Sequence, residues 1–134
     1  MASLEAVPAA RRLDTDRPDL FAVEMVGHVS ANDVENFYGL LEGAYALHTP
    51  LDLLVRIVDH DGVDWGEIDH ATIEAARAHA SRNLARCAII GDDDAAYAIL
   101  RIIRPPESHT RRFAAGDEAE AWTWLQAREV ETRV

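Results

Sequence analysis

Hydrophobic positions along this chain change their spacing several times, and these changes divide it into strands and helices. Nearly continuous apolar runs of seven or eight residues are typical of strands covered on both faces of a sheet. Longer segments in which apolar residues recur every three or four positions are typical of helices that bury one side. The pattern predicts strands at 11–13, 20–26, 51–58, 84–91 and 111–114, and helices at 31–48, 67–82, 92–103 and 116–129.

Local signals fix the ends of several of these helices. Ser30 is expected to be the N-cap of the first helix, with Asp33 at the third helical position, close to a capping box. Pro50 ends that helix, and Pro105 ends the third one. The residues expected on the buried side of the first helix are Val34, Phe37, Leu40, Leu41, Tyr45 and Leu47.

The last helix contains two tryptophans that cannot share one face. We expect Trp124 to point inward with Ala121, Leu125 and Arg128. Trp122 is then expected to be exposed, or to pack on a neighbouring edge or subunit.

Strands and helices alternate along the chain, which predicts the α/β class with the run at 51–58 at the centre of the sheet. A length of 134 residues suits one domain, which we place at 11–130 after a flexible lead-in at 1–10. Cys87 stands alone among apolar neighbours, so it predicts a buried thiol and no intramolecular disulfide. No secretory signal and no long apolar segment is apparent, so we expect a cytoplasmic protein without membrane insertion.

The net charge of −11 makes nucleic acid an unfavourable partner, because binding to phosphates requires clustered positive charge. All 13 basic residues are Arg, so mechanisms that depend on a lysine Schiff base or a P-loop lysine are excluded. Four of these arginines, Arg101, Arg104, Arg111 and Arg112, lie close together in the sequence. They form either a solvated turn or a surface for an anionic ligand or the acidic rim of a partner.

Acidic residues follow the predicted strands, and the carboxyl ends of parallel strands share one edge of a sheet. The candidate binding residues at this edge are Asp59, Asp61, Asp64, Trp65, Asp92 and Asp93. A tryptophan on a loop can anchor an interface, although it can also cover the core. Asp61 and Asp64 have a second interpretation as caps of the helix that begins near Glu67.

Four segments carry a resemblance to a known family. They are "FAVEMVGHVSANDVENF", "LLVRIVDHDGVDW", "RCAIIGDDDAAYAIL" and "TRRFAAGDEAEAWTWL". Their order resembles the SpoIIAA-like family of bacterial proteins, which has the fold of STAS domains, and the likeness covers about Leu20 to Leu125. It implies a four- to five-stranded, mostly parallel sheet with a leading antiparallel edge strand and about four helices.

The resemblance also implies two kinds of role. STAS domains that antagonise anti-sigma factors bind a kinase-like partner and are switched by phosphorylation of a Ser at the start of the helix after the central strand. Similar folds in CRAL-TRIO domains carry an apolar ligand. Residues 50–71 of this chain contain no Ser, Thr or Tyr, so such a switch cannot operate on this turn. Asp61 and Asp64 supply permanent negative charge there instead.

We therefore expect a non-catalytic STAS-like binding or regulatory domain, without a cofactor, that binds a protein partner or a small apolar ligand. A homodimer is possible. The alternative is a metal-assisted enzyme that uses Asp59, Asp61, Asp64 and His60. An EF-hand does not fit these residues, because the glycine falls at position 4 from Asp59 instead of position 6.

Overall fold

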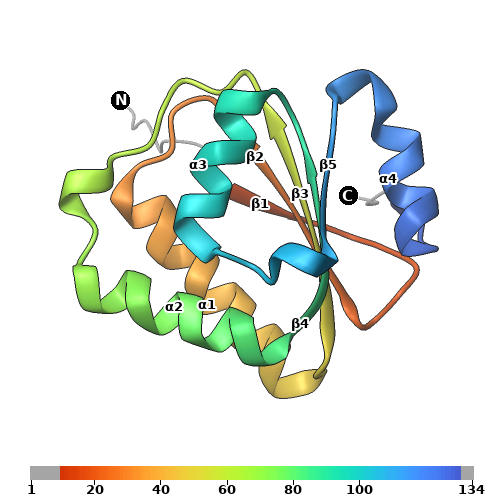
Figure 1. Ribbon diagram of the computed structural model, residues 1–134, viewed down its shortest axis with the longest axis horizontal. Coiled ribbons are helices and arrows are strands. Elements are labelled where there is room, and N and C mark those ends of the chain that lie inside the picture. The colour runs from red at the N-terminus through yellow and green to blue at the C-terminus, as the bar shows by residue number, and fades with distance from the viewer. Residues whose placement is uncertain (1–9, 131–134) are drawn as a thin grey trace, which may run out of the picture.

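The computed structural model describes residues 10–130, apart from the side chains of Trp65, Ile99 and Ile102. Within this range five strands form one sheet in the order β1-β2-β3-β4-β5 (Figure 1). The first pair is antiparallel and the other neighbours are parallel, so the expected α/β fold and its leading antiparallel edge strand are confirmed. The strands are β1 (Ala10–Leu13), β2 (Leu20–Val26), β3 (Leu51–Val58), β4 (Leu84–Ile90) and β5 (Thr110–Phe113). The lead-in expected at 1–10 lies outside the described residues except for Ala10, which begins β1.

Three helices cover one face of the sheet and a fourth covers the other (Figure 1). The described helices are α1 (Ala31–Leu47), α2 (His70–Asn83), α3 (Asp93–Ile103) and α4 (Glu118–Leu125), with short 3-10 helices η1 (Trp65–Glu67), η2 (Glu107–His109) and η3 (Ala115–Asp117). Each parallel connection moves the chain one strand in the same direction, and right-handed crossovers then place α1, α2 and α3 on the same face. Helix α4, which follows β5, covers the opposite face.

The two faces of the sheet have separate hydrophobic cores. Leu53, Val55 and Ile57 of β3 belong to the larger core under α1 to α3, whereas Leu54 belongs to the smaller core under α4. Burial on both faces explains why this strand is an almost continuous apolar run. Cys87 lies in the larger core with 1% of its surface exposed, as its sequence context predicts.

The first helix begins as predicted but buries a narrower stripe. The Ser30 hydroxyl accepts a hydrogen bond from the Asp33 amide at 3.1 Å, and the Asp33 carboxylate accepts one from the Ser30 amide at 2.9 Å. The prediction for Leu40 and Leu47 was wrong, because their surfaces are 44% and 78% exposed. At about 100° per residue, both lie roughly 110–135° around the helix from the middle of the buried stripe. The buried residues of that stripe are Val34, Phe37, Tyr38, Leu41 and Tyr45.

The prediction for Trp122 on α4 was also wrong, whereas Ala121 and Leu125 are buried as predicted and Trp124 packs against the same core. Trp122 is 9% exposed in the smaller core, and its indole N–H donates to the Glu118 carboxylate at 3.0 Å. Trp124 is half-buried against Phe113, with their ring centroids 6.1 Å apart. The helix ends at Leu125, so Arg128 does not extend the inward stripe that the sequence indicated.

Candidate functional site

The parallel strands end together at one edge of the sheet. The Gly27 amide after β2 donates to the Val58 carbonyl at 3.0 Å, and the Gly91 amide after β4 donates to the Phe113 carbonyl at 2.9 Å. The β3 arrowhead and the beginning of α3 both lie at this edge, at the top of Figure 1. We call Asp59, Asp61, Asp64, Asp92 and Asp93, which follow β3 and β4 there, the acidic edge.

The loop after β3 is held in place by backbone hydrogen bonds to the segment after β2. The Asp61 amide donates to the Gly27 carbonyl at 3.1 Å, and the Val29 amide donates to the Gly62 carbonyl at 2.9 Å. Gly62 has a φ of +110°, a conformation that favours glycine. Asp59 has a φ of +50°, which Asp tolerates better than most residues. These backbone hydrogen bonds therefore fix the position of the main chain that carries the acidic side chains.

Capping of the next helix does not explain Asp61 and Asp64, so that interpretation was wrong. Helix α2 begins at His70, and its N-cap residue is Asp69, whose side chain makes no capping hydrogen bond within the described structure. The later start places Thr72, which follows the stretch without hydroxyl groups, in the first turn of α2. Asp61 is exposed, and Asp64 bonds to a histidine from the segment after β2.

That histidine, His28, was not identified as a site residue from the sequence. Its Nε2 lies 2.7 Å from the Asp64 carboxylate, and its Nδ1 lies 3.3 Å from the Asp61 carbonyl oxygen. The hydrogen bond to Asp64 and the contact with the Asp61 carbonyl raise the pKa of His28 above its ordinary value of 6.5. Adjacent parallel strands end side by side, so a residue just after β2 could have been expected beside the loop after β3.

A second part of the acidic edge lies between β3 and the start of α3. Asp59, His60 and Asp92 line a hollow of about 510 Å³. Asp92 is the N-cap of α3, and its carboxylate accepts the Ala95 amide at 2.8 Å, so this residue has a structural role. Asp93 extends into solvent with a side chain that is 98% exposed.

Trp65 is the first residue of η1, directly after Asp64. Its side chain lies outside the described structure, so its role as an anchor stays a prediction.

The described residues contain no group of three or more His, Cys, Asp or Glu side chains that could hold a metal ion. The metal-assisted alternative at Asp59, His60, Asp61 and Asp64 therefore lacks the ligand cluster that it requires in this part of the chain. Two other histidines each lie close to a single carboxylate. His79 lies 2.7 Å from Glu42, and the exposed His70 lies 3.8 Å from Glu74, one helical turn away.

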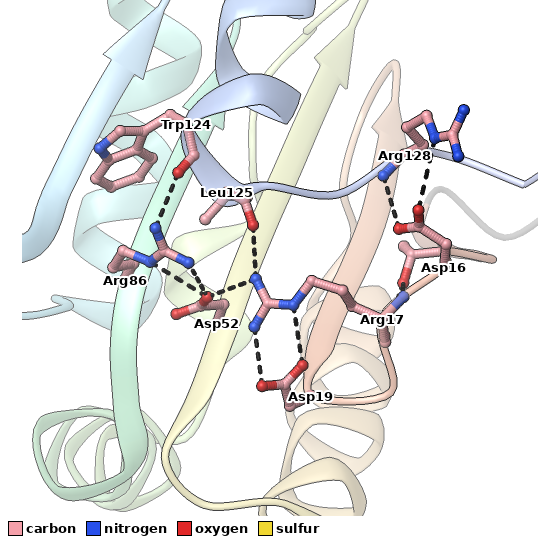
Figure 2. A network of polar contacts seen from close by, with 9 residues as sticks. Asp16, Arg17, Asp19, Asp52, Arg86, Trp124, Leu125 and Arg128 are labelled. Carbon is pink, nitrogen blue, oxygen red and sulfur yellow. Dashed lines mark hydrogen bonds and ion pairs between the residues drawn. The ribbon is translucent and has the colours of Figure 1, made fainter.

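A polar network at the opposite end of β3 was not predicted. Asp52 is 4% exposed, and its carboxylate accepts hydrogen bonds from Arg17 at 2.9 Å and from Arg86 at 2.7 Å. Figure 2 shows the two arginines meeting at this carboxylate and also reaching the end of α4. Arg17 donates to the Leu125 carbonyl at 2.6 Å, and Arg86 donates to the Trp124 carbonyl at 2.8 Å. This network attaches α4 to the sheet.

The arginines near the end of the chain separate onto two faces. Arg101, Arg104 and Arg112 line one groove. The Arg111 guanidinium instead lies over the rings of Phe113 and Trp124, at 5.1 and 5.5 Å from the ring centroids. The four arginines are close in the sequence. However, side chains alternate along β5, so Arg111 and Arg112 lie on opposite faces of the sheet.

Comparison with known proteins agrees with this architecture. A family model described as SpoIIAA-like matches residues 20–126. The chain belongs to the SpoIIAA-like family. This SpoIIAA-like chain is also similar to the crystal structure of an uncharacterized protein of the DUF3478 family, with a SpoIIAA-like fold, from Shewanella loihica PV-4. The two chains share 22% identity with a TM-score of 0.60, over 92% of this chain and 99% of the other.

No curated protein matches this SpoIIAA-like chain. Among the helices within residues 10–130, none has the length and apolar character that crossing a membrane requires.

Proposed function

We propose that this SpoIIAA-like chain is a non-catalytic, STAS-like binding domain that binds a protein partner through the acidic edge, with Trp65 beside it. One observation carries the proposal. The loop after β3 is fixed against the segment after β2 by backbone bonds, and it presents Asp59 and Asp61 to solvent. Neither carboxylate caps a helix, so their exposure at this edge is not explained by local structure.

The topology favours binding over catalysis. In open α/β sheets, ligands usually occupy a crevice where the strand order reverses. The described strands run in sequential order without a reversal, so the usual origin of that crevice is missing. Domains with an STAS-like fold are also generally non-enzymatic. The thiol of Cys87 is a poor nucleophile, because burial raises its pKa to about 12.

Charge complementarity defines the kind of partner. A surface with Asp59, Asp61 and the fully exposed Asp93 suits a protein with a basic patch, and long-range attraction would speed their encounter. Asp61 and Asp64 carry their charge without phosphorylation, so in this proposal the surface is permanently competent to bind.

Site-specific photocrosslinking in cells of the source organism tests this surface. A photoreactive residue at Asp61 should capture a partner that the same residue at Glu74, an exposed position on α2, does not capture. The captured protein is then purified, and its affinity is measured by calorimetry at several salt concentrations.

Exposed ion pairs contribute up to about 1 kcal/mol each, so the double change Asp59→Asn with Asp61→Asn should weaken binding roughly tenfold. Glu74→Gln is the control and should leave the affinity unchanged. Binding that is insensitive to salt and to the double change would rule out the acidic edge as the contact surface.

A second candidate function is the binding of a small apolar ligand beside α1. A hollow of about 440 Å³ lies between this helix and the strands at its edge, and Leu40 and Leu47 are exposed there. Gly39 and Gly43 also line it and leave room next to the helix. Native mass spectrometry of freshly purified protein distinguishes the candidates, because a retained lipid supports this one. A homodimer stays a prediction, which sedimentation analysis tests.

A further inference from the structure

A basic groove of about 770 Å³ lies between α2, α3 and the start of β5. Arg77 reaches it from α2, Arg101 and Arg104 from the end of α3, and Arg112 from β5. Its lining includes one carboxylate, that of Glu107. Positive charge therefore predominates here, although the whole chain has a net charge of −11.

The guanidinium of Arg77 is held in a fixed position at the wall of this groove. Its Nε and Nη2 donate to the Arg101 carbonyl at 3.2 and 2.7 Å. An arginine has five N–H donors, so this contact leaves Nη1 available to a ligand. Within residues 10–130, no carboxylate forms an ion pair with Arg77 or Arg104. Arg112 lies 3.6 Å from Asp93, and both side chains are more than half exposed, so this pair is weak.

The end of a helix does not account for the whole cluster. Cations near the last turn of α3 interact favourably with its carbonyl groups, which explains Arg101 and Arg104. Arg77 and Arg112 belong to other elements and converge on the same groove. Arg77 and Arg104, which form no ion pair among the described residues, share this groove with the weakly paired Arg112, and an anionic ligand would relieve the repulsion between these charges.

We propose that this groove binds a small organic phosphate, with its phosphate among the arginines and its ring or chain against Tyr97 and Leu100. Guanidinium groups match phosphate oxygens in a bidentate geometry. Tyr97 is 63% exposed, and with Leu100 it gives the groove an apolar wall. The volume lies within the usual range for small-ligand sites. The groove adjoins the acidic edge at the pair of Arg112 and Asp93, but the proposal does not depend on binding at that edge.

Calorimetry at low salt with pyrophosphate, ADP and adenosine tests the site. Pyrophosphate and ADP should bind, and adenosine should not, because the arginines recognise the phosphate. Arg77→Gln and Arg112→Gln should each weaken ADP binding about tenfold or more. The matched control is Arg82→Gln, which removes the same charge from an exposed position on α2 outside the groove.

Tyr97→Ala tests the apolar wall, because it should weaken ADP binding while leaving pyrophosphate binding unchanged. Arg112 and Tyr97 are exposed, so these two variants should fold even if Arg77→Gln does not. Absence of binding by both pyrophosphate and ADP would overturn the proposal. An equal loss of affinity in Arg82→Gln and in the groove variants would overturn it as well, since it would indicate a general charge effect.

Discussion

Replacing Asp52 with Asn tests whether the network in Figure 2 fixes α4 to the sheet. The substitution preserves the size of the side chain and one acceptor oxygen, but it removes the negative charge between two arginines. The Asp52 side chain is 5% exposed, and those of Arg17 and Arg86 are 21% and 30% exposed. Removal of one partner from a buried ion pair typically costs about 3–5 kcal/mol.

The expected loss is smaller here, because each arginine keeps other partners. Arg17 still bonds to Asp19 at 3.0 Å and to the Leu125 carbonyl, and Arg86 still bonds to the Trp124 carbonyl at 2.8 Å. Both guanidinium groups also remain partly hydrated. We therefore expect Asp52→Asn to lower the free energy of unfolding by about 2–3 kcal/mol.

Urea unfolding followed by tryptophan fluorescence and far-UV circular dichroism gives this difference by linear extrapolation. Asp19→Asn is the control, because its carboxylate is 47% exposed and contacts the same arginine, and it should cost less than about 1 kcal/mol. Hydrogen exchange should also become faster in α4 than in α1. A free energy of unfolding equal in the two variants would refute the assignment of Asp52 as the centre of the network.

Two further predictions follow from ionisable groups. The raised pKa of His28 means that its contribution to stability is fully present below about pH 6.5 and is lost as the pH rises through the higher value of the folded state. Asp64→Asn should return the pKa of His28 toward 6.5 in an NMR titration, and an unchanged titration would contradict the hydrogen bond. Burial raises the pKa of Cys87 to about 12, so the native thiol should not react with a disulfide reagent at pH 8 but should react in denaturant; rapid native reaction would show that the thiol is accessible.

The sequence predicted the central strands accurately because apolar runs reflect burial on both faces. The run at 51–58 coincides with β3, and the run at 84–91 differs from β4 by one residue. Helix ends with local chemical signals were also predictable, as the capping box of Ser30 and Asp33 shows. The start of α2 was not, because η1 intervenes and Asp69 provides no side-chain cap.

The candidate site was predictable in part. Parallel strands bring Asp59 and Asp92 to one hollow, as their positions after β3 and β4 suggest. The partner of Asp64 was not found, because His28 lies 36 residues away and no local spacing connects the two. Arg77 was missed for the same reason, since its place in the groove depends on the packing of α2 against α3.

The errors on the α4 side of the sheet have a common physical cause. A single helix of eight residues cannot cover a face of five strands, so charged side chains occupy part of that face. Arg56 of β3 bonds there to Glu24, Glu118 and Glu129, each at 2.8 Å. The periodicity of apolar residues predicts which face of the sheet helices cover by hydrophobic packing. It does not predict contacts on the α4 face, where ion pairs between arginines and carboxylates replace part of that packing. For that reason the spacing of apolar residues did not predict the burial of Trp122.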